Sequence, residues 1–313
     1  MATFSKASFD AVAYAASRPS YPPALYQHVI DYATSSLSLS NSQSKTLLDL
    51  GSGPGLSTFE FCSTFNKVIA IDPSKKMINA ANDILLQKLN SNQIDQTVCE
   101  VEFHQASSEQ LQHVVEDASV DLIVAGQAAH WFDADRVYNE CGRVLKPGGS
   151  FAFWCYGEAF FPQRPKLTAL VGPYSHDKLG PYWQQPGRSI AEALLKTFPF
   201  PNPNSTFQTN VWDSTSFKRC FFLKQDSIQP VIDNDPSTTK IEIKPLLLTK
   251  LWTLKEIKGY LETWSSLHSY KEQHPQEDPV KDMLASLEQA GLNHQEQVEV
   301  GWELGFIMGK KIS

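Results

Sequence analysis

Cysteine is scarce in this sequence, and none of it lies in a metal-binding spacing. The 313 residues contain five cysteines, an odd number, without a C-x-x-C pair. This pattern argues against a disulfide framework and a structural zinc site, and it is typical of reduced thiols. We therefore expect a cytoplasmic protein without a bound metal. The five residues are Cys62, Cys99, Cys141, Cys155 and Cys220.

Long apolar runs and an excess of positive charge are also missing. No run is long enough to cross a bilayer, and the first residues lack the apolar stretch of a secretory signal. The formal net charge of −7 argues against a general nucleic-acid surface. A hydrophobic content of 42% and a charged content of 19% fit a globular chain. We expect a monomer with neither membrane nor nucleic acid as partner.

A glycine-rich turn is the most informative pattern that is present. The apolar run 47–50 ends in Gly51, Gly53 and Gly55, and a second apolar run ends in Asp72. Such a turn lets backbone N–H groups approach a ligand, and the acid can accept hydrogen bonds from a ribose diol. The pattern predicts a nucleotide-like cofactor. A dinucleotide fingerprint requires glycine or alanine where Leu56 stands, which argues against a nicotinamide oxidoreductase.

Strands and helices alternate through the first half of the chain, which predicts a parallel sheet with right-handed crossovers. Expected strands cover 46–51, 67–72, 98–104, 120–126 and 149–156, and expected helices cover 56–64, 74–88, 108–115 and 134–145. An N-terminal arm, 1–45, is expected to hold helices over 7–16 and 24–33. Residues 157–204 are rich in proline and aromatic residues, which indicates an insertion. Further on we expect a strand over 206–212, helices over 253–268 and 280–289, and a final strand over 298–308.

This pattern predicts that the chain is divided into three parts. Residues 1–45 form a helical arm or lid, 46–156 form the cofactor-binding core, and 157–313 form a substrate-side insertion and the C-terminal strands of the same domain.

The assembled motifs resemble those of a known enzyme family. The G-x-G-x-G spacing resembles motif I of the class I S-adenosylmethionine (SAM) methyltransferases. The segments 9–22, 129–133 and 179–189 resemble the fungal trans-aconitate methyltransferases, and the resemblance covers nearly the whole chain. A sister group that acts on cantharidin is less similar through 179–189. The resemblance implies a Rossmann-like, doubly wound α/β sheet of seven strands with an antiparallel last strand, and a helical insertion after the fifth strand.

Several residues are expected to bind SAM. The glycine turn would carry its methionine part and Asp72 its ribose hydroxyls, through charge-assisted hydrogen bonds. Asp49 either meets the ammonium group or has a structural role, and Met77 either touches adenine or belongs to the core. Ser107 stands where many relatives carry an acid, so adenine recognition is not assigned to one side chain. The expected cofactor residues are Tyr14, Arg18, Asp49, Gly51, Gly53, Asp72, Met77, Ser107, Ser108 and Gln127.

Other residues are expected to face the acceptor. His130 and Trp131 follow the fourth strand, whose carboxyl end faces the ligand crevice of such sheets. The alternative for this pair is packing under a loop. Arg188 presents a planar fork that matches a carboxylate, and its alternative is a structural salt bridge. Arg18 would bind the SAM carboxylate, the acceptor, or a lid. The expected catalytic residues are His130, Trp131 and Arg188, and Tyr21, Tyr182 and Trp183 complete the acceptor site.

The resemblance implies methyl-ester formation on a carboxylate of a small polycarboxylic acid, with trans-aconitate as the first candidate. A carboxylate is already ionised near neutral pH and needs no general base. Catalysis would then consist of positioning and desolvation. Two alternatives keep the SAM fold: another small acid or xenobiotic as acceptor, such as a cantharidin-type diacid, and a non-catalytic SAM-binding protein.

Overall fold

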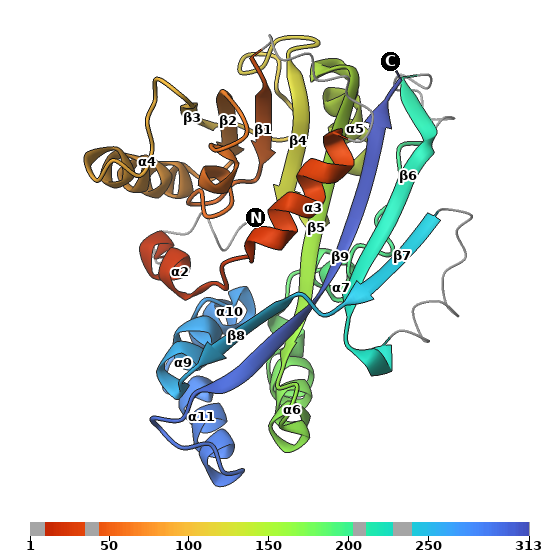
Figure 1. Ribbon diagram of the computed structural model, residues 1–313. Coiled ribbons are helices and arrows are strands. Elements are labelled where there is room, and N and C mark those ends of the chain that lie inside the picture. Colours follow the sequence, from red (N-terminus) through yellow and green to blue (C-terminus); the bar gives the residue numbers. More distant parts are fainter. Residues whose placement is uncertain (1–9, 35–43, 203–210, 228–239, 313) are drawn as a thin grey trace.

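The protein is built around one mixed β-sheet, which has nine strands in the part of the chain that the structure describes (Figure 1). The computed structural model describes residues 10–34, 44–202, 211–227 and 240–312. The strand order is β3-β2-β1-β4-β5-β9-β6-β7, and β8 pairs with one end of β9. Strands β1 to β5 are parallel to one another, whereas β9 runs antiparallel to β5, β6 and β8.

The strands have the following bounds: β1 Thr46–Leu50, β2 Lys67–Asp72, β3 Glu100–Gln105, β4 Val120–Gly126, β5 Leu145–Phe160, β6 Trp212–Leu223, β7 Lys240–Pro245, β8 Leu248–Trp252 and β9 Val298–Lys311.

The α-helices are α2 Ala11–Ser17, α3 Pro23–Thr34, α4 Lys75–Asn90, α5 Ala134–Val144, α6 Pro165–Gly172, α7 Gly187–Glu192, α9 Leu254–Glu262, α10 Ser265–Gln273 and α11 Pro279–Gln289. Short 3₁₀ turns cover Thr58–Phe61, Ala129–Trp131, Gly180–Tyr182 and Gln225–Ser227, and a π-helical turn covers Pro173–Lys178.

Both faces of the central sheet are buried, because its strands carry apolar residues at consecutive positions. Leu47, Val124 and Trp154 point to the face covered by α3 and α4, and they share a core with Leu25 of α3. The next residues along the strands point to the opposite face, where they pack on α5. A parallel sheet covered on both sides explains why these strands lack the alternation of polar and apolar residues.

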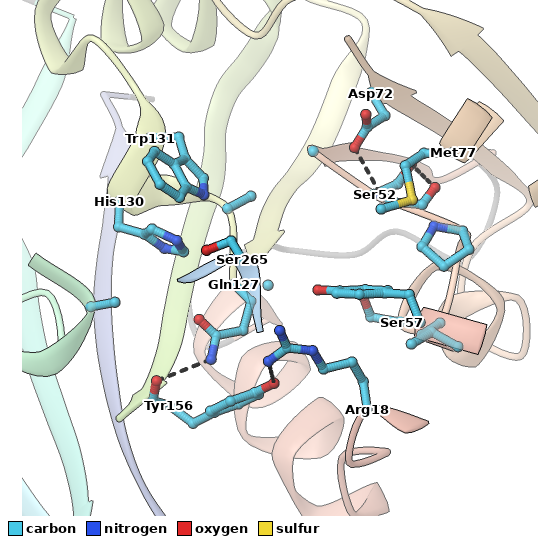
Figure 2. A pocket seen from close by; sticks show the side chains of 18 of the residues that line it. Arg18, Ser52, Ser57, Asp72, Met77, Gln127, His130, Trp131, Tyr156 and Ser265 are labelled. Atoms are coloured by element: carbon cyan, nitrogen blue, oxygen red, sulfur yellow. Dashed lines mark hydrogen bonds between the residues drawn. The ribbon is translucent and has the colours of Figure 1, made fainter. Parts of the chain in front are cut away.

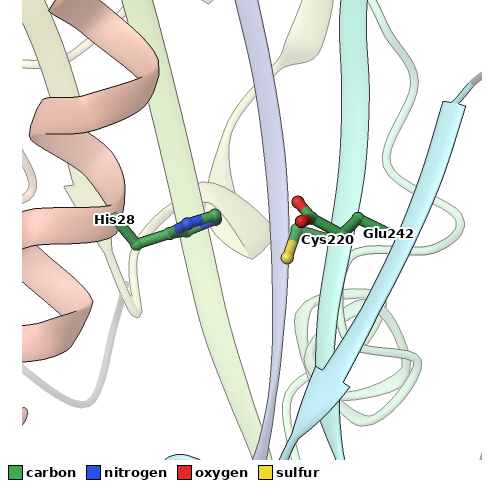
Figure 3. Close-up of side chains that lie close together, drawn as sticks. All are labelled: His28, Cys220 and Glu242. Atoms are coloured by element: carbon green, nitrogen blue, oxygen red, sulfur yellow. The ribbon is translucent and has the colours of Figure 1, made fainter.

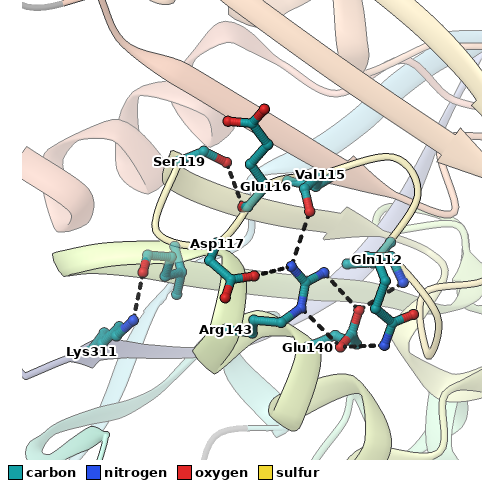
Figure 4. Close-up of polar contacts among 10 residues, drawn as sticks. Gln112, Val115, Glu116, Asp117, Ser119, Glu140, Arg143 and Lys311 are labelled. Carbon is teal, nitrogen blue, oxygen red and sulfur yellow. Dashed lines mark hydrogen bonds and ion pairs between the residues drawn. The ribbon is translucent and has the colours of Figure 1, made fainter.

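A buried acid fixes α5 to the connection between β3 and β4 (Figure 4). Glu140 accepts from the backbone N–H of Leu111 at 2.7 Å, and from Arg143 Nη2 at 2.9 Å. Arg143 also donates to the carbonyl oxygen of Val115 at 3.0 Å and pairs with exposed Asp117. The glutamate side chain is only 2% exposed, so its charge depends on these partners.

The predicted doubly wound fold with a helical insertion after β5 and an antiparallel last strand is confirmed. The expected count of seven strands is wrong, since β7 and β8 extend the sheet to nine. Most of the expected strand 206–212 lies outside the described residues, and the strand that follows, β6, was not predicted. Its residues 213–218 are largely polar and only partly buried, which hid the strand pattern.

Three predicted helices differ from the structure. The segment 56–64 forms only a 3₁₀ turn at Thr58–Phe61, flanked by further turns. The segment 108–115 forms turns that are held by Glu140 rather than a helix. The helix expected over 253–268 is two helices, since the backbone of Trp264 is extended. No described helix has the length and apolar character that crossing a bilayer requires.

Candidate active site

A deep pocket lies at the carboxyl ends of β1, β2, β4 and β5 (Figure 2). This is the edge at which open α/β sheets bind their ligands. The N-terminal arm closes one side through residues 14–21, and α9 and α10 close another through Tyr260, Trp264 and Ser265. The site is thus assembled from segments that are far apart in the sequence.

The glycine turn has the backbone that the sequence indicates. Gly51 has a φ of +68° and Gly53 a φ of +56°. Residues other than glycine rarely adopt this left-handed backbone conformation. A Cβ at Gly51 would lie 2.6 Å from the Cβ of Ala128, whereas a Cβ at Gly53 would meet no atom within 4 Å. The turn is therefore packed against Ala128, in the segment that follows β4, on one side and leaves open space on the other.

Asp72 ends β2 and holds this turn in place. One carboxylate oxygen accepts from the backbone N–H of Gly53 at 3.0 Å, and the other accepts from that of Ser74 at 2.8 Å. Burial raises the pKa of Asp72, and the two backbone donors oppose that shift. Its carboxylate lines the pocket, as expected for a group that accepts hydroxyl donors.

Asp49 lies beneath the turn and is 1% exposed. Its Oδ2 accepts from Thr58 Oγ1 at 2.6 Å, while its Oδ1 is buried without a hydrogen-bond partner among the described residues. Burial raises its pKa to about 7, against the effect of the Thr58 hydroxyl. A buried carboxylate with an unused oxygen favours a cationic group nearby.

Arg18 supplies positive charge from the arm. Its guanidinium donates to the Tyr156 hydroxyl at 2.9 Å and to the Thr263 carbonyl at 3.2 Å, and its buried Nε has no hydrogen-bond partner among the described residues. It stacks over the rings of Tyr14 and Tyr260 at 4.8 and 5.4 Å. No carboxylate of the described residues pairs with it, so within this part of the chain Arg18 is a pocket-lining cation without a counter-ion.

His130 and Trp131 follow β4 and line the wall opposite the arm (Figure 2). Burial, together with the nearby charges of Arg18 and Arg188, lowers the pKa of His130 to about 3, so the ring is neutral at pH 7. The ring of Trp131 packs closely on Gly187, where a Cβ would approach it to 2.5 Å. The absence of a side chain at Gly187 therefore sets the position of the indole.

Arg188 lines the pocket, but its charge is already paired. Its Nη2 donates to Glu158 Oε1 at 3.0 Å, its Nε lies 2.6 Å from Glu192 Oε1, and its guanidinium stacks over Trp183 at 4.0 Å. His176 faces both glutamates, at 3.4 and 3.6 Å. Both interpretations of Arg188 thus hold in part, since it faces the cavity and forms salt bridges.

The structure brings most of the remaining expected residues together. Met77 lines the pocket from α4 and is also packed against Ala80, and the Ser107 hydroxyl bonds to the Glu109 carboxylate. The other expected lining residues are Tyr14, Tyr21, Ser108, Gln127 and Trp183. Tyr182 is a correction: it does not line the cavity, because its hydroxyl lies 2.8 Å from His274 Nε2 and its ring packs on Tyr270.

Sequence reasoning missed several residues of the site. Tyr156 and Glu158 lie at the carboxyl end of β5, and their place after a predicted central strand was a signal that could have identified them. Cys155 contacts His130, and Tyr260 lies under Arg18. Tyr260 comes from a late helix that no motif connects to the glycine turn.

Comparisons with known proteins agree on one kind of enzyme. Residues 48–153 match the family described as a methyltransferase domain. The "Probable S-adenosylmethionine-dependent methyltransferase CRG1" of Saccharomyces cerevisiae is 25% identical over 279 residues, which cover 88% of this chain and 86% of that protein. The chain is a class I SAM-dependent methyltransferase. Methyltransferase pgmE of Aspergillus terreus is 24% identical over 318 residues, covering 96% of this methyltransferase and 92% of the relative.

A solved structure extends the likeness to the whole fold. A protein described as a type II methyltransferase from Anaeromyxobacter dehalogenans matches this methyltransferase with a TM-score of 0.64 and 25% identity. The match covers 94% of this chain and 97% of that one. The helical insertion and the last strands are therefore part of a shared architecture.

The pocket of this methyltransferase fits its cofactor SAM. The open space above Gly53 gives room for a ligand beside the turn, and Asp72 offers acceptor oxygens on the pocket lining. The expected cofactor residue Asp49 is not among the lining residues, because it lies buried beneath the turn. When bound, SAM supplies an electrophilic methyl group on a sulfonium. The chain itself contributes a site closed by aromatic residues, in which reactants are held away from water.

A second cluster of polar groups lies away from this pocket (Figure 3). His28 of α3 points toward Cys220 and Glu242, which are register partners on β6 and β7. Lys244 Nζ lies 3.3 Å from both His28 Nδ1 and Glu242 Oε1, and Lys218 also pairs with the glutamate. The ammonium groups of Lys244 and Lys218 thus face the glutamate, and that of Lys244 also faces one nitrogen of His28. The cluster is therefore an ion-pair network on β6 and β7.

Proposed function

We propose that this methyltransferase forms a methyl ester on a carboxylate of a small polycarboxylic acid. The observation that carries the proposal is Arg18, a pocket-lining guanidinium without a carboxylate partner in the described chain. An unpaired, buried cation is costly unless a ligand brings an anion to it. An acidic acceptor, or the carboxylate of SAM, would provide that anion.

The groups available for proton transfer support the same class of acceptor. His130 is neutral, and with a pKa of about 3 it is a weak base. Glu158 faces the cavity but is engaged by Arg188. A carboxylate nucleophile needs no base, whereas a hydroxyl or amine acceptor would need one. The pocket therefore suits an acceptor that is ionised before it binds.

Trans-aconitate is the first acceptor to test, on the strength of the segments 129–133 and 179–189. Arg188 would bind a second carboxylate of such an acid. Its Nε and Nη2 are held by the two glutamates, and the stack on Trp183 fixes the plane of the remaining fork. Arginine clamped in this way is an oriented donor.

A diacid of the cantharidin type is the second candidate. Glu158 and Glu192 bring two negative charges to Arg188, so the acceptor end of the pocket holds less net positive charge than a triacid would favour. An acceptor with two carboxylates matches that balance better than one with three.

The test is methyl transfer from labelled SAM to trans-aconitate, cis-aconitate, isopropylmalate, citrate and a cantharidin-type diacid. Selective labelling of trans-aconitate supports the first candidate, and selective labelling of the diacid supports the second. If SAM binds but no acid is labelled, carboxyl methylation is wrong for this enzyme. We also propose a monomer in the cytoplasm, in keeping with five cysteines that form no disulfide in the structure.

A further inference from the structure

A cysteine that no motif identified lies behind the histidine of the pocket. Cys155 is a fully buried residue of β5, and its Sγ lies 3.2 Å from His130 Nδ1. His130 Nε2 has no partner among the described residues, and the ring lines the cavity. Figure 2 shows the imidazole directed from the β4 wall toward the middle of the pocket. One ring nitrogen therefore meets the thiol, while the other is left for a ligand.

Both members of the pair are neutral at physiological pH. Burial raises the pKa of the Cys155 thiol, against a smaller opposing effect of the His130 backbone N–H. Burial lowers the pKa of His130. The pair thus contains one hydrogen on sulfur and one on the imidazole, and the remaining question is which ring nitrogen carries the latter.

The contact distinguishes the two tautomers. If the thiol donates to Nδ1, the imidazole nitrogen acts as the acceptor, and the ring hydrogen lies on Nε2. If Nδ1 carried the hydrogen, it would face a protonated sulfur, which is a weak acceptor. The S–H group would then have no acceptor among the described residues. The first arrangement, in which the thiol donates to Nδ1, leaves the buried S–H group paired and is therefore lower in free energy.

We propose that Cys155 is a positioning residue that holds His130 as its Nε2–H tautomer. His130 then offers a hydrogen-bond donor to the acceptor, and it does not serve as a general base. This inference deepens the proposed function, since a donor at this place suits an anionic carboxylate. The statement about the tautomer itself does not depend on which acid is methylated.

The direct test is the nitrogen chemical shifts of the His130 ring in the wild-type protein at pH 7. Long-range proton–nitrogen correlation of ¹⁵N-histidine-labelled enzyme separates protonated from unprotonated ring nitrogens. The signal of His130 among the eight histidines is assigned by its loss in His130→Gln. We expect a protonated Nε2 and an unprotonated Nδ1. A protonated Nδ1 overturns the proposal.

Variants test whether the contact matters for turnover. Cys155→Ala removes the donor, and we expect the KM of the acceptor to rise about three- to tenfold while the Kd of SAM stays within twofold, because one modest hydrogen bond is lost. Cys155→Ser retains a donor and should recover most of the loss. Cys141→Ala is the matched control, since Cys141 is equally buried but lies on α5.

The outcomes separate this inference from the proposed function. If Cys155→Ala changes the KM no more than Cys141→Ala does, Cys155 has no positioning role. If no acid is methylated but the ring carries its hydrogen on Nε2, the tautomer assignment stands and the proposed acceptor class falls.

Discussion

Replacing Arg18 by methionine should separate ligand binding from fold stability. Arg18 donates to two neutral oxygens, those of Tyr156 and Thr263, and it has no carboxylate partner in the described chain. Methionine keeps much of the volume between Tyr14 and Tyr260 but removes the charge. Because the Arg18 charge has no carboxylate partner among the described residues, it is available to a ligand. Its removal should therefore weaken ligand binding more than it destabilises the ligand-free protein.

The magnitudes follow from these contacts. A hydrogen bond between charged groups contributes about 1.5–3 kcal/mol, so the anionic ligand should bind roughly 10- to 150-fold more weakly to Arg18→Met. In the ligand-free protein, two hydrogen bonds of about 1 kcal/mol each are lost, and the burial cost of an unpaired cation is removed. The free energy of unfolding should therefore change by less than about 1 kcal/mol. Arg18→Lys keeps the charge without the fork and should lie between.

Calorimetry with two nucleosides identifies the ligand of Arg18. S-adenosylhomocysteine carries the amino-acid carboxylate, and 5′-methylthioadenosine lacks it. Weaker binding of the first alone assigns Arg18 to the cofactor carboxylate. Unchanged binding of both, with a raised KM for the acceptor, assigns Arg18 to the acceptor. The reasoning is refuted if neither S-adenosylhomocysteine binding nor the KM of the acceptor changes. It is also refuted if Arg18→Met loses more than about 3 kcal/mol of unfolding free energy in denaturant titration.

Three further predictions concern stability, measured by denaturant unfolding. Gly51→Ala should cost about 2–4 kcal/mol and Gly53→Ala only about 1 kcal/mol, since both residues have positive φ but only a Cβ at Gly51 meets another atom. Equal losses would mean that the packing of Gly51 against Ala128 is unimportant. Glu140→Ala should cost about 3 kcal/mol because it strands a partly buried arginine, whereas Asp117→Ala, at a side chain 76% exposed, should cost less than about 1 kcal/mol. Burial lowers the pKa of His130 from 6.5 to about 3, so between these values the unfolded chain binds a proton that the folded protein does not, and stability falls as the pH falls. His130→Gln should accordingly lose less stability than the wild type between pH 6.5 and 4.5, and an equal loss would contradict the shift.

The central sheet was predictable because its strands combine short apolar runs with turn signals. Strands β1, β2 and β4 were placed within a residue or two, and Asp72 was expected at the end of β2. The sequence pattern failed where tertiary contacts decide the structure. Residues 108–115 have helical composition, yet the buried carboxylate of Glu140 holds their backbone in turns.

The candidate site was predictable on the cofactor side and less so on the acceptor side. The glycine turn and Asp72 are local features of one βαβ unit, and spacing alone relates them. The surroundings of Arg18 and Arg188 depend on Tyr156, Tyr260 and Glu158, which belong to other elements. Tyr182 was misplaced because its neighbours in sequence line the pocket, while its own ring turns toward α10.

The position of β9 has a consequence for how the chain reaches this fold during synthesis. Residues 298–311 come last among the strands, yet they lie between β5 and β6 and also pair with β8. Until they have left the ribosome, β5 has an unpaired edge, and β6, β7 and β8 have no place in the sheet. The nascent chain therefore carries an exposed, apolar strand edge from the synthesis of β5 until that of β9, roughly the second half of its translation. Such an edge is the kind of surface that chaperones bind and that otherwise aggregates.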